Sequence, residues 1–149
     1  MPRQRVTLIT PGVTDLDRAR AFYRDWGWQP HGSSTPEISF YQMNGAILAL
    51  FGRDALAGDQ GRAGAELGTG AMTLAQNCPD KAQVDAVFDA ALTAGAASLK
   101  RPEEVFWGGY SGYFADPDGH VWEIASNPFL PLDATGGATL PEQSDGMDG

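Results

Sequence analysis

The feature that most constrains this chain is an internal repeat, because its two halves carry the same order of predicted elements. In each half a strand-like stretch precedes an amphipathic helix. A capping box of Thr14 and Asp17 is expected to open the first helix and Gly27 to end it, and Asp80 and Gly95 are the expected ends of the second. Strands are expected at residues 5–9, 28–31, 37–43 and 46–51 in the first half, and at residues 71–77, 97–100, 110–115 and 120–125 in the second. A βαβββ unit therefore occurs twice.

Two turn sequences align the halves with each other. Asn44-Gly45 is the pair that a type I′ hairpin turn favours, and Asp118-Gly119 stands 74 positions later. This shift places Ala49 on Glu123. The chain is therefore expected to form an α+β fold of two βαβββ modules, with curved mixed sheets around a cup-shaped cavity and helices outside.

The turns also predict which residues face each other across the hairpins. Two-residue turns place Phe40 opposite Ala49 and Phe114 opposite Glu123. A carboxylate framed by two phenylalanines would attract a cation or a hydrogen-bond donor on a flat ligand.

Composition along the chain predicts its boundaries. The modules are expected at residues 1–52 and 71–129, and residues 53–70 hold five glycines and form a linker with a short helical turn near residues 54–56. Residues 130–149 are poor in apolar side chains, carry four acids and no Lys or Arg, and are expected to be a disordered acidic tail.

Charge and composition exclude several classes of function. The 149 residues carry a net charge of −9, which disfavours nucleic acid and anionic membranes as partners. Cys78 is the single cysteine and His31 and His120 are the only histidines, so nitrogen and sulfur ligands for a metal are scarce. The N-terminus lacks a hydrophobic signal core, and no apolar run is long enough to span a membrane. A cytoplasmic protein is expected.

Two motifs, in addition to the repeated modules, resemble the vicinal oxygen chelate superfamily, which includes glyoxalases, extradiol dioxygenases and bleomycin resistance proteins. They are Asp15-Leu16 followed by Phe22-Tyr23, and the closing segment 114–123, Phe-Ala-Asp-Pro-Asp-Gly-His-Val-Trp-Glu. The resemblance covers about residues 5–129. It implies the fold above and, in many members, a homodimer.

The resemblance also implies four metal-ligand positions in the metal-dependent members. Here they fall on Leu8, on Ala49, on the start of the fifth strand at residues 71–73, and on Glu123. Only Glu123 carries a typical ligand, and one carboxylate does not hold a divalent ion with useful affinity. No metal and no cofactor are therefore expected.

These residues favour a metal-free protein that binds a small aromatic or cationic molecule, similar to the bleomycin resistance proteins. Glu123 is the expected anchor or catalytic base, although it could instead be a structural residue bound by a neighbouring backbone group or a tyrosine hydroxyl. The expected ligand-binding residues are Glu123, Phe114, Phe40, Leu8, Ala49, and Trp107 and Tyr110 from a glycine-hinged loop.

Two enzymatic alternatives stay open. The first is a glyoxalase-like lyase, isomerase or dioxygenase whose metal is recruited by Glu123 with Gln76 or Glu103. The second is a metal-independent enzyme with Glu123 as its base.

Overall fold

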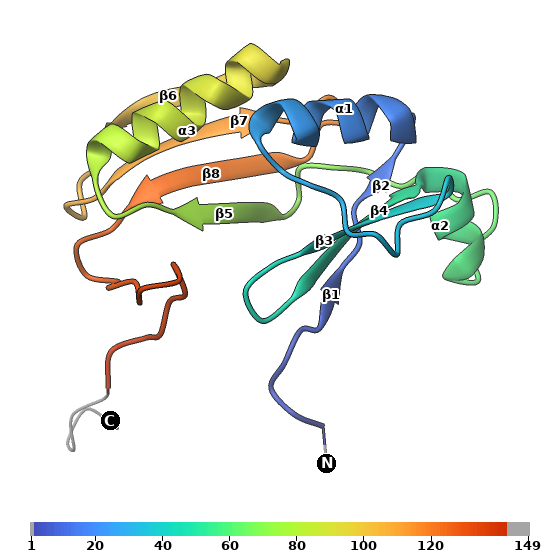
Figure 1. Cartoon of the computed structure of the whole chain (residues 1–149), viewed down its shortest axis with the longest axis horizontal. Coiled ribbons are helices and arrows are strands. Elements are labelled where there is room, and N and C mark those ends of the chain that lie inside the picture. Colours follow the sequence, from blue (N-terminus) through green and yellow to red (C-terminus); the bar gives the residue numbers. More distant parts are fainter. Residues whose placement is uncertain (1, 143–149) are drawn as a thin grey trace.

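A computed structural model describes residues 2–142 and confirms the mixed α+β fold, with three helices and two separate mixed sheets (Figure 1). The strands and helices follow in the order β1 Leu8–Ile9, β2 Gly12–Val13, α1 Leu16–Trp26, β3 Ile38–Gln42, β4 Ile47–Gly52, α2 Arg53–Asp59, β5 Thr73–Asn77, α3 Lys81–Ala94, β6 Ala97–Glu104, β7 Tyr110–Ala115 and β8 Val121–Ser126. Within the described residues, no helix has the length and apolar character needed to cross a membrane.

The first sheet contains β1 to β4. The expected first strand is divided into β1 and β2, which both run parallel to β4, with Leu8 beside Ile47 and Gly12 beside Phe51. Pro11 stands at the break and has no N–H to donate, although its carbonyl accepts a hydrogen bond from the N–H of Phe51 (3.2 Å). The hairpin register of β3 and β4, with Phe40 opposite Ala49, is the expected one.

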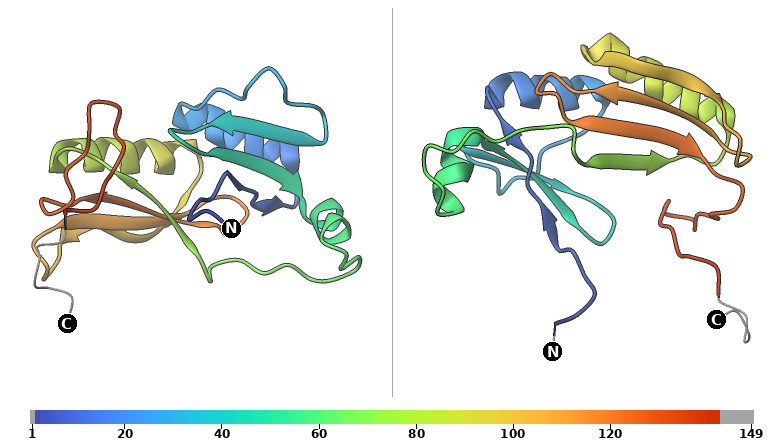
Figure 2. Two further views of the ribbon diagram at one scale, coloured as in Figure 1. Left: turned by 90° about the horizontal axis from the view of Figure 1, so that it is seen from below. Right: turned by 180° about the vertical axis from the view of Figure 1, so that it is seen from behind.

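The second sheet has the strand order β5-β8-β7-β6. It lies in front of α3 when the molecule is seen from behind (Figure 2, right). The strand expected at residues 97–100 continues to Glu104, with irregular pairing around Pro102. The loop before β7 is therefore shorter than the sequence suggested.

Local capping chemistry sets the ends of both long helices, although the cap of α1 is Asp15 and not Thr14, the residue that the sequence suggested. Asp15 accepts a hydrogen bond from the N–H of Arg18 (3.1 Å), and Asp80 accepts one from the N–H of Gln83 (2.8 Å). Gly27 ends α1 with a φ of 117°. Gly95 ends α3 in the same left-handed conformation.

The strand expected at residues 28–31 is absent. The N–H of Trp28 donates to the carbonyl of Tyr23 (2.8 Å) and so completes the end of α1 instead of pairing with a strand. His31 is the one residue of this segment whose N–H reaches β3, where it donates to Phe40 (2.7 Å). The first half is therefore not a complete βαβββ unit.

Two smaller expectations also differ from the structure. Residues 53–59 form the helix α2, where the sequence suggested a single turn. In the described chain no residue other than glycine has a positive φ. The Asn44-Gly45 turn is therefore not type I′, which needs a positive φ at both central residues.

Part of the predicted disordered tail has a defined shape. Leu132 and Ala138 form an isolated β-bridge around a turn, and the Asp133 carboxylate accepts hydrogen bonds from Thr135 and Gly137 inside it. The remainder of the predicted tail, residues 143–149, lies outside the described residues. The module boundaries at residues 52, 70 and 129 stay a prediction.

The two long helices, α1 and α3, share one core with both sheets. Phe22 and Trp26 of α1 contact Phe114 of β7, with ring centroids 6.3 Å and 5.4 Å apart. Trp122 of β8 packs edge-on against Trp26, with ring centroids 5.3 Å apart. The two halves therefore meet through their helices and through the helix-facing sides of the sheets.

Candidate functional site

Glu123 lies in the middle of the second sheet, on the face that points away from α3. Its neighbours Trp122 and Ile124 are buried in the core, and side chains alternate along a strand, so Glu123 faces the other way. Directly paired residues place Glu123 between Ala75 of β5 and Tyr113 of β7. The half-buried carboxylate is thus presented on an open sheet face.

Tyr113 holds this carboxylate from the neighbouring strand. Its hydroxyl donates a hydrogen bond to Oε2 of Glu123 (3.2 Å). Burial raises the pKa of Tyr113, and the charge of Glu123 raises it further. Lys100 follows Tyr113 in the same row, and its ammonium group is paired with Glu103 (3.1 Å). The Tyr113 contact is one that either an anchoring or a structural carboxylate would make.

Phe114 is not beside Glu123, and the predicted pairing of the two residues is wrong. Phe114 pairs with Trp122 and is 0% exposed, beneath the helices. The loop between β7 and β8 is longer than the expected two-residue turn. The N–H of Asp116 donates to the carbonyl of His120 (2.9 Å), which leaves three residues between them. A shift of one residue moves every side chain to the opposite face.

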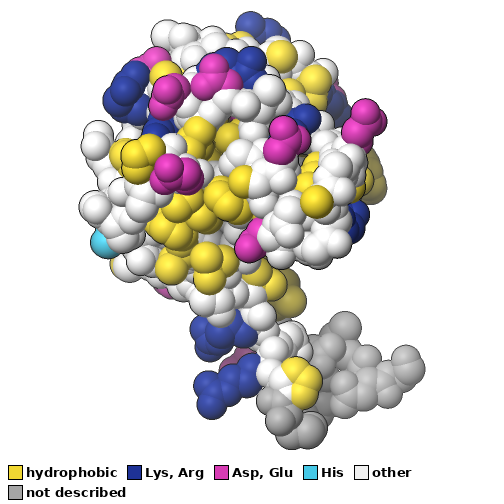
Figure 3. Space-filling view, turned by 90° about the vertical axis from the view of Figure 1, so that its right-hand side faces the viewer, with side chains coloured by type: hydrophobic (Ala, Val, Ile, Leu, Met, Phe, Trp, Pro, Cys, Tyr) yellow, Lys and Arg dark blue, Asp and Glu magenta, His cyan; other side chains and the backbone are white. Residues whose placement is uncertain are grey.

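Three other predicted residues share one face of the first sheet. Leu8 pairs with Ile47, and Phe40 pairs with Ala49, on the face away from the core residues Leu48 and Leu50. Further half-buried apolar residues on this face are Ile38, Ile47 and Phe51. A shallow hollow of about 200 Å³ opens at Phe40 and Ile47. From the side of α2, hydrophobic side chains gather in one area bordered by charged ones (Figure 3).

The loop before β7 stays close to the second half. Trp107 is 37% exposed, and its ring lies where a Cβ on Gly109 would stand. The hydroxyl of Tyr110 donates to Asp85 of α3 (2.7 Å). The structure therefore does not bring Trp107 and Tyr110 into the row of Glu123.

The family's metal ligand set does not fit these residues. Leu8 and Ala49 have no donor atom. The fifth-strand residue that pairs with Glu123 is Ala75, not one of the predicted residues 71–73, and it has no donor atom either. Between residues 2 and 142 there is no group of three or more His, Cys, Asp or Glu side chains that could hold a metal ion. Gln76 lies on the opposite face of β5 from Ala75, which separates it from Glu123.

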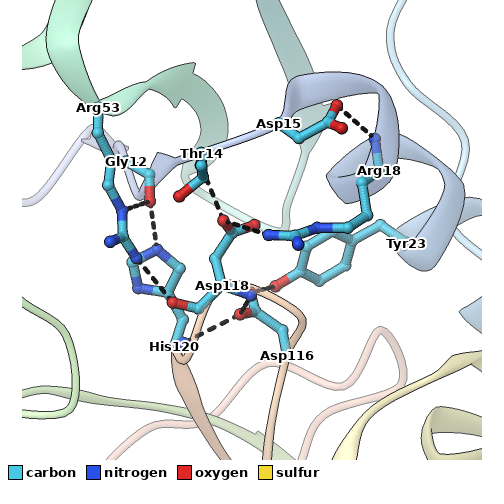
Figure 4. A network of polar contacts seen from close by, with 9 residues as sticks. All are labelled: Gly12, Thr14, Asp15, Arg18, Tyr23, Arg53, Asp116, Asp118 and His120. Carbon is cyan, nitrogen blue, oxygen red and sulfur yellow. Dashed lines mark hydrogen bonds and ion pairs between the residues drawn. The ribbon is translucent and has the colours of Figure 1, made fainter.

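The two aspartates of the closing turn do more than shape it (Figure 4). Asp116 accepts hydrogen bonds from the N–H groups of Asp118 and His120, both at 2.9 Å, and from the Tyr23 hydroxyl (2.6 Å). Asp118 binds the N–H of Thr14 (2.8 Å) and the guanidinium of Arg18 (3.0 Å). The turn therefore joins the second half to α1.

His120 contributes to the same junction. Its Nε2 lies 2.7 Å from the carbonyl oxygen of Gly12, so this half-buried histidine packs beside the turn. Arg53 of α2 donates to the carbonyl of Asp118 (2.7 Å) and completes the junction on the other side. These contacts fix the position of both sheets around the candidate site.

A larger hollow reaches Ala75, the neighbour of Glu123, but is not lined by Glu123 itself. It has a volume of about 590 Å³ and opens between the β3–β4 hairpin and β5. Its lining includes Trp28, Tyr41, Leu48, Leu74, Gln76 and Trp122. We call it the intersheet hollow. Sequence patterns did not indicate it, because its residues are far apart in the chain and individually look like core residues.

Comparison with known proteins agrees with the observed fold and shows the family. Residues 6–124 match the model of the Glyoxalase/Bleomycin resistance protein/Dioxygenase superfamily. No curated protein is significantly similar to the chain. A glyoxalase-related enzyme from Fulvimarina pelagi is 39% identical over 94% of this chain and 100% of its own, with a TM-score of 0.87.

Two more distant structures share the fold. A glyoxalase/bleomycin resistance protein/dioxygenase family enzyme from Burkholderia phytofirmans PsJN is 22% identical, covers 80% of this chain and 96% of its own, and has a TM-score of 0.71. A lactoylglutathione lyase from Agrobacterium tumefaciens is 24% identical, covers 85% and 96%, and has a TM-score of 0.64. Since the family model spans most of the chain, this protein belongs to the glyoxalase/bleomycin resistance protein/dioxygenase superfamily.

Proposed function

We propose that this protein binds a small organic molecule that joins a flat aromatic part to a cationic or amine group, and that it does so without a metal. The observation that most directly supports this proposal is the position of the Glu123 carboxylate, which lies on an open sheet face and accepts a hydrogen bond from the Tyr113 hydroxyl. A half-buried carboxylate with one donor in place retains capacity for a second, charged donor from a ligand. Ala75 beside it leaves room for that ligand.

The apolar part of the ligand needs a second surface. The face of the first sheet that carries Leu8, Phe40 and Ala49 has the required character, and Leu8 is 48% exposed. We propose that two copies of this chain associate and bring this face of one protomer over the Glu123 face of the other. Light scattering is expected to show a dimer, and a monomer at all concentrations would contradict this part.

The charge of Glu123 provides the test of ligand binding. Two probes of similar size differ in their own charge. Tryptamine is protonated at neutral pH, and tryptophol is uncharged. Glu123→Gln keeps the size of the side chain and should weaken tryptamine binding by about 1.5–3 kcal/mol, the range for a hydrogen bond to a charged group. Tryptophol binding should change little. Glu103→Gln, which removes an exposed acid paired with Lys100, is the matched control.

Titration calorimetry with these variants, together with their melting temperatures, separates the roles of Glu123. If Glu123→Gln lowers the melting temperature and leaves tryptamine affinity unchanged, the residue is structural and the proposal fails. Elemental analysis of protein purified without chelator addresses the metal. About one metal ion per chain would favour the metal-dependent alternative instead.

The similar Fulvimarina pelagi protein is described as a glyoxalase-related enzyme, which keeps catalysis by Glu123 as the alternative function. Turnover of a bound compound that disappears in Glu123→Gln would establish it. The cytoplasmic location is part of the same proposal, and cell fractionation tests it.

A further inference from the structure

The intersheet hollow is a second concave site, which reaches around the edge of β5 from Ala75 to the helix-facing side of the sheets. Trp122 and Leu48 line it, and both belong to the helix-facing sides of their strands. Its volume of about 590 Å³ lies within the range of small-molecule sites. It therefore has the size of a ligand site, and it differs from the site of the proposed function because Glu123 does not line it, although Ala75 borders both.

One wall of the hollow is aromatic. The ring centroids of Trp28 and Tyr41 are 5.5 Å apart, and those of Trp28 and Trp122 are also 5.5 Å apart. Trp28 is stacked on Tyr23 behind it, at 5.0 Å, and is itself only half-buried. A half-buried indole that is fixed from behind offers a flat surface for a planar ring.

The opposite wall is an unpaired strand edge. β5 pairs with β8 on one side and has no strand partner on the other among the described residues. Four consecutive residues of β5, Leu74 to Asn77, line the hollow, so the strand meets it with its edge. The backbone N–H and C=O groups on such an edge can bind a neighbouring donor and acceptor.

The polar groups of the hollow are neutral. Its lining contains no Asp, Glu, Lys, Arg or His, and the amides of Gln29, Gln76 and Asn77 stand at its edge. Tyr41 is 2% exposed, and its hydroxyl has no hydrogen-bond partner within residues 2–142. An acceptor on a ligand that reaches this hydroxyl would supply the missing partner.

We infer that the intersheet hollow binds an uncharged planar heteroaromatic molecule that carries both a hydrogen-bond donor and an acceptor, stacked on Trp28 and bound along the free edge of β5. The absence of charge in the lining distinguishes this ligand from the cationic one proposed for Glu123. Ligands with a phosphate or carboxylate at this position are disfavoured, since the lining offers no cation to them.

The test uses quinazolin-4-one, which has the donor and acceptor, and naphthalene, which has the same size and neither. Quenching of tryptophan fluorescence is expected to give quinazolin-4-one a Kd below about 1 mM and naphthalene a Kd at least tenfold higher. Ala46→Phe places a ring at the mouth of the hollow and should weaken quinazolin-4-one binding about tenfold or more. Ala63→Phe, at an exposed position outside the hollow, should leave it unchanged.

A second pair of variants tests the hydroxyl. Tyr41→Phe should weaken quinazolin-4-one several-fold without affecting naphthalene, whereas Tyr113→Phe, which removes the hydroxyl beside Glu123, should affect neither. Equal affinities for the two probes, or an unchanged affinity in Ala46→Phe, would overturn the inference. Binding that is lost as the chain dimerises would also overturn it, because a second copy would then fill the hollow. Glu123→Gln should not alter these results, so failure here is distinct from failure of the proposed function.

Discussion

Tyr23 joins the two halves of the molecule, and replacing it by Phe measures how much this junction contributes to stability. Tyr23 is 1% exposed on α1. Its hydroxyl donates to Asp116 (2.6 Å) and accepts a hydrogen bond from the indole N–H of Trp122 (3.0 Å). Tyr23→Phe keeps the ring and removes both hydrogen bonds at once.

The expected cost follows from these two partners. A hydrogen bond to a charged group contributes about 1.5–3 kcal/mol, and a buried donor left without a partner costs about 1–3 kcal/mol. Asp116 keeps its bonds from the N–H groups of Asp118 and His120, which limits the first loss. We expect a loss of about 3 kcal/mol in the free energy of unfolding, or roughly 10 °C in Tm for a chain of this size.

Urea denaturation followed by tryptophan fluorescence measures this loss. Tyr110→Phe is the matched control, because its hydroxyl binds Asp85 at an exposed position and should contribute less than about 1 kcal/mol. If Tyr23→Phe costs no more than Tyr110→Phe, the junction between the halves does not stabilise the fold as argued.

The pH dependence gives an independent check on Tyr23. Burial, and next the charge of Asp116, raise the pKa of Tyr23 well above its ordinary value of 10.0. The neutral phenol is therefore favoured in the folded chain, and its contribution to the free energy of unfolding is fully present below about pH 10. It is lost as the pH rises above that value, by up to about 1.4 kcal/mol per pH unit. The decline in stability should be shallower in Tyr23→Phe, and an equal slope in both proteins would refute the reasoning.

Two further predictions concern the second half. Gly112→Ala would place a Cβ 2.7 Å from the backbone nitrogen of Pro102, so β6 must move, and the free energy of unfolding should fall by about 1–3 kcal/mol in urea titrations. Cys78 is 5% exposed, and burial, with a smaller effect of Asp80, raises the pKa of its thiol. It should react with Ellman's reagent about 100-fold or more slowly in the native chain than in urea, and fast native labelling would show that β5 opens readily.

Features set by neighbouring residues could be predicted from the sequence. Gly27, Asp80 and Gly95 act through bonds to residues three or four positions away, so these helix ends were found correctly, and the start of α1 was found within one residue, at Asp15 instead of Thr14. The β3–β4 register was also correct, because a two-residue loop determines it.

Features that depend on distant residues could not be predicted. The loop between β7 and β8 is closed by Asp116 and His120 while Tyr23 and Thr14 hold it from the first half, and this longer loop moved Phe114 into the core. Trp28 looked like a strand residue, yet its backbone ends α1 and its ring joins an aromatic wall that only the folded chain assembles. Glu123 therefore stays a predicted site residue, whereas Phe114, which the sequence placed beside it, lies elsewhere.

The contact between Thr14 and Asp118 also bears on how the chain is made. These residues are separated by 104 positions, yet the start of α1 depends on the Asp118 carboxylate. During synthesis from the N-terminus, α1 emerges long before its anchor does, and contacts of such separation form late. The first half therefore cannot complete its packing, and the apolar side of α1 stays uncovered, until the final hairpin leaves the ribosome. A nascent chain halted before residue 118 should accordingly bind chaperones that recognise apolar segments, and release from them should coincide with completion of the closing turn.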